Sequence, residues 1–138
     1  MNFTPDNITE LKKNQIFVFG SNEAGIHGAG AAKLAEEKFG AVRGVSYGLQ
    51  GNSFAVPTKD RSIRTLPLER IEFYIRGLLL NAYLSPDKEF LVTKIGCGLA
   101  GYSEREIANL FKDKTIPTNV TLPESFYRII NENHEEKP

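Results

Sequence analysis

The sequence contains a single cysteine, Cys97, among its 138 residues. This excludes an internal disulfide framework and any metal site that needs several cysteine ligands, and it is typical of a reducing compartment. A surplus of one charge is also lacking, because 17 basic residues balance 17 acidic ones. The chain as a whole therefore carries no clear nucleic-acid signal and no sign of a membrane-binding surface.

Long hydrophobic runs are absent as well. The apolar stretches fall far short of the ~20 residues needed to cross a bilayer. The first residues, MNFTPDNITELKKNQ, have neither the basic start nor the apolar core of a signal peptide. These absences predict a cytoplasmic protein with no membrane partner. The length predicts a single domain over residues 1–138, whose polar end, residues 131–138, is expected to form a flexible tail.

The order of the apolar segments is typical of an α/β domain with a mainly parallel sheet. Runs of strand length lie at residues 16–19, 54–56, 89–94 and 120–122. Helical patterns lie at residues 29–39, from Pro67 to Ser85, after the capping-box pattern Ser103-x-x-Glu106, and after Pro123. Pro57 is expected to end the second strand. Residues 3–11 and 42–47 show no pattern that supports an assignment.

Two segments downstream of strands are rich in glycine, 20-GSNEAGIHGAG-30 and 96-GCGLAGY-102. Ligands of open α/β sheets bind beyond the carboxyl ends of the strands, where these segments and the loop at residues 57–65 are expected to meet. A helix follows each glycine segment, and the free N–H groups at its start favour an anion such as phosphate. Glycines that serve only tight turns are the alternative. The spacing matches neither the dinucleotide fingerprint, since Lys33 occupies the third glycine position, nor the P-loop.

Three segments in a fixed order resemble a known family: 28-GAGAAKLAEEKFG-40, 54-FAVPTKD-60 and 94-KIGCGLAGYSE-104. Together they resemble the ADP-ribose-binding macrodomains, and they are most similar to the class that contains the terminal ADP-ribose protein glycohydrolase. The similarity extends over roughly residues 15–112. It implies a three-layer α/β/α domain that binds ADP-ribose or a related ribose-diphosphate nucleotide.

The resemblance also implies which residues contact that ligand. The first wall of the diphosphate site consists of Gly28, Ala29 and Gly30, and the second of Gly96, Cys97, Gly98, Leu99, Ala100 and Gly101. Asn22 resembles an asparagine that lies near the distal ribose, and Tyr102 resembles an aromatic lid. Glycine allows the backbone to approach a phosphate, so we expect valine at Gly98 to strain the backbone and to block the ligand.

Lys59 lies where the glycohydrolase class carries a lysine that attacks the anomeric carbon of the distal ribose. A lysine attacks only as the free amine. The class also carries a carboxylate directly after I-G-C-G-L, and this sequence has Ala100 there. Asp60 or Glu23 would have to replace it, although neighbouring residues at a strand end point to opposite sides. ADP-ribosyl-protein hydrolysis, with an ADP-ribosylated protein as partner, is therefore an alternative to binding alone.

Several features leave further alternatives open. The chain has no counterpart of the early aspartate that contacts adenine in many macrodomains, so recognition of the base is open. Cys97 as a nucleophile would need His27 as its partner, and His27 with Glu23 gives too few ligands for a metal. Arg61 and Arg64 fit either phosphate contacts or a solvated loop. No cofactor is expected, and a protein-interaction domain without nucleotide binding is the third candidate function.

Overall fold

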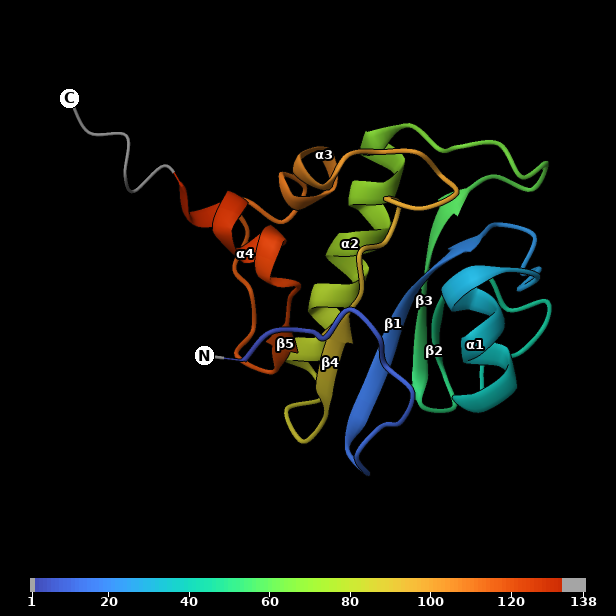
Figure 1. The fold of residues 1–138 in the computed structure, drawn as a ribbon, viewed down its shortest axis with the longest axis horizontal. Coiled ribbons are helices and arrows are strands. Elements are labelled where there is room, and N and C mark those ends of the chain that lie inside the picture. Colours follow the sequence, from blue (N-terminus) through green and yellow to red (C-terminus); the bar gives the residue numbers. More distant parts are fainter. Residues whose placement is uncertain (1, 133–138) are drawn as a thin grey trace.

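The computed structural model describes residues 2–132, in which five strands and four helices alternate (Figure 1). In chain order they are β1 (Gln15–Asn22), α1 (Gly30–Lys38), β2 (Gly48–Gln50), β3 (Ser53–Lys59), α2 (Leu68–Tyr83), β4 (Glu89–Val92), α3 (Glu104–Ala108), β5 (Val120–Thr121) and α4 (Glu124–Asn131). The strands form one sheet in the order β2-β3-β1-β4-β5. Only the β2–β3 pair is antiparallel.

β1 is the central strand because its residues are suited to burial on both faces. Residues 16–19 form a continuous apolar run, and each of them is at most 2% exposed. Such a run is typical of a parallel strand covered on both sides. β1 pairs in parallel with β3 on one side and with β4 on the other. The carboxyl ends of these three strands therefore lie at the same end of the sheet.

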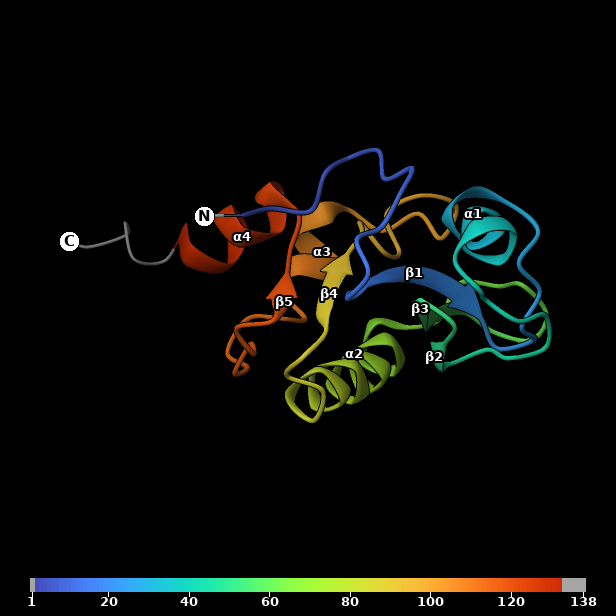
Figure 2. The same cartoon turned by 90° about the horizontal axis from the view of Figure 1, so that it is seen from below.

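Helices cover both faces of this sheet. Val18 belongs to a core cluster that includes Ile71 and Ile75 of α2, whereas its neighbour Phe19 belongs to a second cluster that includes Ala35 of α1. Figure 2 shows α1 and α2 on opposite sides of the strands. α3 and α4 add apolar side chains to the cluster of α2. The chain is thus a single α/β domain with a mixed, mostly parallel sheet flanked by helices, which confirms the predicted α/β class and mainly parallel sheet.

The second strand does not end at Pro57 as the sequence suggests. β3 continues to Lys59 and stays paired with β1 through the partners Ser21 and Pro57. On its other side, the pairing with β2 reaches only Ala55. No β2 residue therefore needs the N–H that proline lacks, and a proline is tolerated where a strand has no hydrogen-bonded neighbour. The prediction was wrong because it did not anticipate how short β2 is.

Two parts of the chain outside the predicted elements also have a defined structure. β2 forms a hairpin with β3, and the left-handed conformation of Gly51 (φ 60°) makes the tight link between them. Gly51-Asn52 is a local signal for such a hairpin, whereas residues 42–47, which had no assignment, form no helix or strand. The N-terminal segment from residue 2 also forms none, but the backbone N–H of Thr4 donates to Leu122 O at 2.9 Å and Ile8 is buried in the cluster of α1.

α2 is the longest helix of the described residues. Pro67 is its N-cap, with a φ of −65°, and the helix ends at Tyr83, before the predicted stop at Ser85-Pro86. The residues of its buried face recur at helical spacing. They are Ile71, Ile75, Leu78, Leu79 and Ala82. Neither α2 nor any other helix within residues 2–132 has the length and apolar character required to cross a bilayer.

The ends of other predicted elements shift by one or two residues. α1 starts at Gly30, with Ala29 as its N-cap, and β4 stops at Val92. The predicted polar tail at residues 131–138 overlaps α4, because Asn131 is the last residue of that helix. Residues 133–138 of that tail lie outside the described part of the chain.

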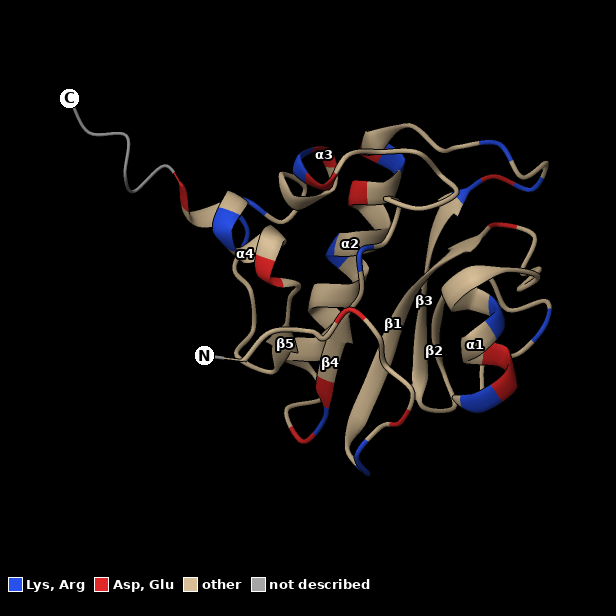
Figure 3. Ribbon diagram, in the orientation of Figure 1, with Lys and Arg blue, Asp and Glu red and all other residues tan. Residues whose placement is uncertain are grey.

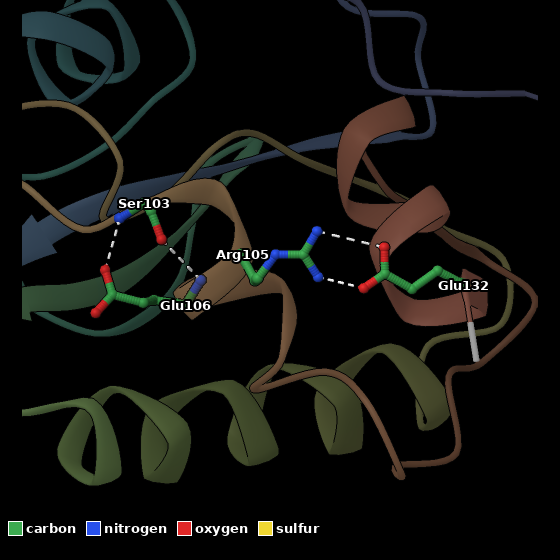
Figure 4. Close-up of polar contacts among 4 residues, drawn as sticks. All are labelled: Ser103, Arg105, Glu106 and Glu132. Atoms are coloured by element: carbon green, nitrogen blue, oxygen red, sulfur yellow. Dashed lines mark hydrogen bonds and ion pairs between the residues drawn. The ribbon is translucent and has the colours of Figure 1, made fainter. Parts of the chain in front are cut away.

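The predicted capping box at the start of α3 is present (Figure 4). The Glu106 N–H donates to Ser103 Oγ at 3.1 Å, and the Ser103 N–H donates to Glu106 Oε1 at 2.9 Å. Arg105 of the same helix forms a two-pronged ion pair with Glu132 at the end of α4. The box thus satisfies these two amides at the start of α3.

Replacing Ser103 with alanine should destabilise the protein by about 1 kcal/mol, the usual effect of removing a side-chain N-cap. Urea denaturation monitored by circular dichroism measures the change. Ser62→Ala is a matched control, because the Ser62 hydroxyl makes no hydrogen bond within residues 2–132. Equal midpoints for the two variants would show that the box does not stabilise α3.

Candidate functional site

A cleft of about 400 Å³ opens at the carboxyl ends of β1, β3 and β4. It is lined by the three loops that follow these strands and by the first turn of α1. The lining residues are Gly20, Ser21, Asn22, Ile26, residues 28–32, Thr58, Lys59, Ile63, residues 93–96, Gly98, Leu99 and Ala100. Since ligands of open α/β sheets bind at this end of the strands, the cleft is the candidate site.

The first wall of the cleft is the start of α1. Ala29 is the N-cap and offers no side-chain acceptor, and no acidic residue occupies the first turn. The backbone N–H groups of residues 28–32 donate to no group within residues 2–132. An uncapped helix start presents several free N–H groups together with the positive end of the helix dipole. This wall therefore suits an anion.

The second wall is the loop after β4, at residues 96–100. The N–H groups of Gly96, Gly98, Leu99 and Ala100 also donate to no described residue. Cys97 differs, because its N–H donates to Lys94 O at 3.2 Å. The loop is closed by the bond from the Tyr102 N–H to Gly96 O at 2.9 Å. Free amides thus border the cleft on two sides, and backbone amides of this kind form anion-binding concavities.

The glycines of the second wall are required for different reasons. Gly96 has a φ of +76°, and a Cβ there would lie 2.8 Å from Ile107 Cδ1, so both dihedral and space demand glycine. Gly98 is outside the left-handed region, and a Cβ there would meet nothing within 4 Å. The prediction that valine at Gly98 would strain the backbone is therefore wrong. The valine side chain would still block the cleft.

The charge of the cleft is positive. Lys59 and Lys94 line it, and no aspartate or glutamate is among the described residues that do so. Lys94 pairs with Glu104 at 3.1 Å and Asp6 at 3.7 Å, and the hydrogen bond that it donates to Glu104 raises the pKa of Lys94. The Lys59 ammonium forms no hydrogen bond or ion pair within residues 2–132. Figure 3 shows the basic residues at the end of β3 and along the next loop.

Asn22, expected near a ribose, lies in the cleft wall but is already bonded. Its Nδ2 donates to Ile26 O at 2.7 Å, and its Oδ1 accepts from the Ile26 N–H at 3.0 Å. These bonds shape the turn that leads from β1 toward α1. Both ends of the side-chain amide are thus used by the protein itself.

Neither candidate carboxylate lines the cleft. Asp60 Oδ1 accepts from the Arg64 N–H at 2.9 Å and the Ser62 N–H at 2.8 Å, and the bond from Arg64 lowers the pKa of Asp60. Glu23 Oε2 accepts from the Tyr74 hydroxyl at 2.6 Å and pairs with Arg70. Both carboxylates are engaged in bonds within the protein. Neither is therefore placed to serve as the carboxylate that the resemblance implies at the position of Ala100.

Cys97, Gly101 and Tyr102 are not part of the cleft lining. Cys97 and Tyr102 pack against the cluster of α2, and the Tyr102 hydroxyl donates to Leu66 O at 2.5 Å. Burial, followed by the nearby Glu104, raises the pKa of the Cys97 thiol to about 11. A neutral thiol is a poor nucleophile. The second wall thus offers its backbone amides to the cleft, while two of its side chains support the core.

His27 is buried and forms no metal site with the described residues. Its Nε2 lies 3.1 Å from Val42 O, and its ring packs edge-on against Phe19. Glu23 is held elsewhere by Tyr74 and Arg70. The other histidine, His134, lies outside the described residues. The structure thus gives no support to a Cys–His pair or to a metal ligand set.

Ile63 lines the cleft, and no sequence motif singles it out. It has a φ of +64° and is 43% exposed. A β-branched residue in the left-handed region is a true outlier, and such strain costs on the order of 1–3 kcal/mol. Two further exposed aliphatic residues, Ile26 and Leu99, line the same cleft. The glycine pattern predicted the two walls of backbone amides but not this apolar part of the cleft lining.

Comparison of the chain with protein-family models, with curated proteins and with solved structures gave no match. The cleft itself is therefore the basis for a functional proposal.

Because its pKa is raised to about 11, the Cys97 thiol should react slowly with iodoacetamide at pH 8. The alkylation rate should rise steadily as the pH approaches 11. In urea the thiol should react at pH 8 like an ordinary cysteine with a pKa near 8.5. Mass spectrometry of timed samples gives both rates. Fast labelling of the folded protein at neutral pH would contradict the buried, neutral thiol.

Proposed function

We propose that the cleft binds the diphosphate of ADP-ribose or a related ribose-diphosphate nucleotide. The observation that carries the proposal is the set of free backbone amides on two sides of one cleft. Such N–H groups, at an uncapped helix start and in an open loop, are satisfied either by water or by a ligand. A diphosphate has acceptor oxygens on both of its phosphates, so it can accept bonds from both walls.

The electrostatics of the cleft support an anionic ligand. The start of α1 contributes a partial positive charge, and Lys59 adds a full one. No carboxylate among the lining residues opposes them. The start of α3 contributes less than the sequence suggested, because the capping box already engages the Ser103 and Glu106 amides. The second wall therefore acts mainly through its loop amides.

The resemblance to macrodomains supports the identity of the ligand. The segments that carry it include the cleft residues 28–30, Thr58, Lys59 and residues 94–96. A three-layer α/β/α domain of macrodomain type fits a sheet with α1 and α2 on opposite faces. Within that family, glycine loops hold a diphosphate with their main chain. The proposed ligand is thus the one for which backbone amides are the main contacts.

A second candidate function is removal of ADP-ribose from a modified protein. The position of Lys59 in the cleft, without an ion-pair partner among the described residues, favours it. The lack of a carboxylate in the described cleft lining favours binding alone, because no residue there is placed to act on a lysyl intermediate. The third candidate is an interaction domain whose loops are only turns. It gives the free amides of both walls no role.

Gly98→Val tests the binding site without disturbing the fold. A Cβ at this position meets no atom within 4 Å and needs no unusual dihedral, so the free energy of unfolding should change by less than about 0.5 kcal/mol. The valine would occupy the space over the second wall, and affinity for ADP-ribose should fall by more than about tenfold, or 1.4 kcal/mol. Isothermal titration calorimetry measures the affinity, and thermal unfolding confirms that the variant is folded.

A wild-type protein that binds neither ADP-ribose nor ADP at millimolar concentration would refute the proposed function and leave the interaction domain as the better candidate. Equal affinities of wild type and Gly98→Val for ADP-ribose would remove the second wall from the binding site.

The hydrolase candidate is tested with a mono-ADP-ribosylated protein as substrate. If Lys59 is the nucleophile, wild-type protein should release ADP-ribose and Lys59→Ala should be inactive. Lys94→Ala is the control for a lost positive charge, since Lys94 lines the cleft but is paired with Glu104. Mass spectrometry of the substrate follows the release. Activity that survives in Lys59→Ala would exclude the lysine mechanism.

A further inference from the structure

The strained residue Ile63 lies on a loop that the protein fixes from several directions. Asp60 Oδ1 accepts from two amides of the loop, and the Asp60 N–H donates to Arg64 O at 2.7 Å. The Ile63 N–H donates to Asp60 O at 3.0 Å. A residue in a sparsely populated conformation persists only when its surroundings impose it. These bonds impose the left-handed conformation on Ile63.

The same loop is attached to the end of β3 and to the second wall. Thr65 pairs with Lys59, so the loop closes on the strand end from which it starts. The Thr65 hydroxyl donates to Ala100 O at 2.9 Å, which joins the loop to the second wall. Ile63 is therefore held in the cleft lining beside Lys59.

Stability does not explain why isoleucine occupies this position. Glycine adopts a φ of +64° without strain, and asparagine tolerates it better than a β-branched residue. At 43% exposure Ile63 belongs to neither core cluster. A residue that is costly to the backbone and not required by the core is a candidate for a ligand contact.

We propose that Ile63 is a specificity-determining residue that packs against the sugar ring beyond the diphosphate, on the side of the cleft that holds Lys59. The amides of the two walls are assigned to the phosphates, so the sugar is left to the residues on the Lys59 side of the cleft lining, which include Ile63. The C–H face of a ribose is apolar, and an aliphatic side chain covers it while the ring hydroxyls remain hydrated. The inference rests on the proposed function and names the part of the ligand that distinguishes ADP-ribose from ADP.

Calorimetry of wild type and Ile63→Gly with ADP-ribose and with ADP tests this inference. The variant should bind ADP-ribose roughly tenfold more weakly, a loss of about 1.4 kcal/mol. Its affinity for ADP, which lacks the second ribose, should stay within about twofold, or 0.4 kcal/mol. Its unfolding temperature should rise by roughly 2–4 °C, because the strain is relieved.

Two further variants separate the contact from the backbone effect. Ile63→Ala keeps a Cβ in the strained conformation and removes most of the side chain, so it should lose the same affinity for ADP-ribose without the rise in unfolding temperature. Asp113→Gly is the matched control, since Asp113 has a φ of +65° and lies outside the cleft lining. It should leave both affinities unchanged and change the unfolding temperature little, because aspartate tolerates this conformation.

The outcomes distinguish the inference from the function on which it rests. Wild type that binds neither nucleotide refutes both. Wild type that binds ADP-ribose, with Ile63→Gly and Ile63→Ala binding it equally well, refutes the role of Ile63 and leaves the proposed function intact. A loss that is equal for ADP and ADP-ribose also overturns the inference, because the contact then lies with a part common to both ligands.

Discussion

The parallel pairing of β1 with both of its neighbours is the constraint on which the rest of the structure depends. It forces the carboxyl ends of β1, β3 and β4 to one end of the sheet, so the loops after them meet there. Backbone groups that leave a sheet lose their strand partners and must be satisfied elsewhere. Four N–H groups in the loop after β4 and five at the start of α1 remain without a partner within the described chain. The cleft is therefore a direct consequence of the topology.

Polar side chains near the cleft are mostly engaged in shaping it. Asn22 fixes the turn after β1, Asp60 fixes the loop after β3, and Ser103 caps the helix after the second wall. Because these three residues are bonded to the backbone of their own loops, they hold the loops in place rather than offer themselves to a ligand. For the proposed anion, the backbone amides and Lys59 are then the contacts that remain.

The sequence predicted the parts of the fold that depend on local pattern. A strand that is buried on both faces needs a continuous apolar run, and a helix that is buried on one face needs apolar residues at helical spacing. β1 and α2 carry these patterns, so both elements were predicted. β2 was not predicted, although Gly51-Asn52 is a local hairpin signal. The N-terminal segment was not predicted because its partners are distant in the sequence. The glycine-rich segments after two strands predicted that these loops meet, and the resemblance implied the residues of the two walls. Ile63 was not predicted, because its conformation depends on hydrogen bonds to Asp60 that no short motif encodes.

The two left-handed residues that are not glycine show how position decides the meaning of strain. Asp113 lies in the turns after α3, and aspartate tolerates this conformation through its short polar side chain. Ile63 lacks that tolerance, since a β-branched side chain is among the least suited to a positive φ. Its loop nevertheless carries several hydrogen bonds and a strand pairing that maintain the conformation. These bonds keep Ile63 in the cleft lining despite its unfavourable conformation.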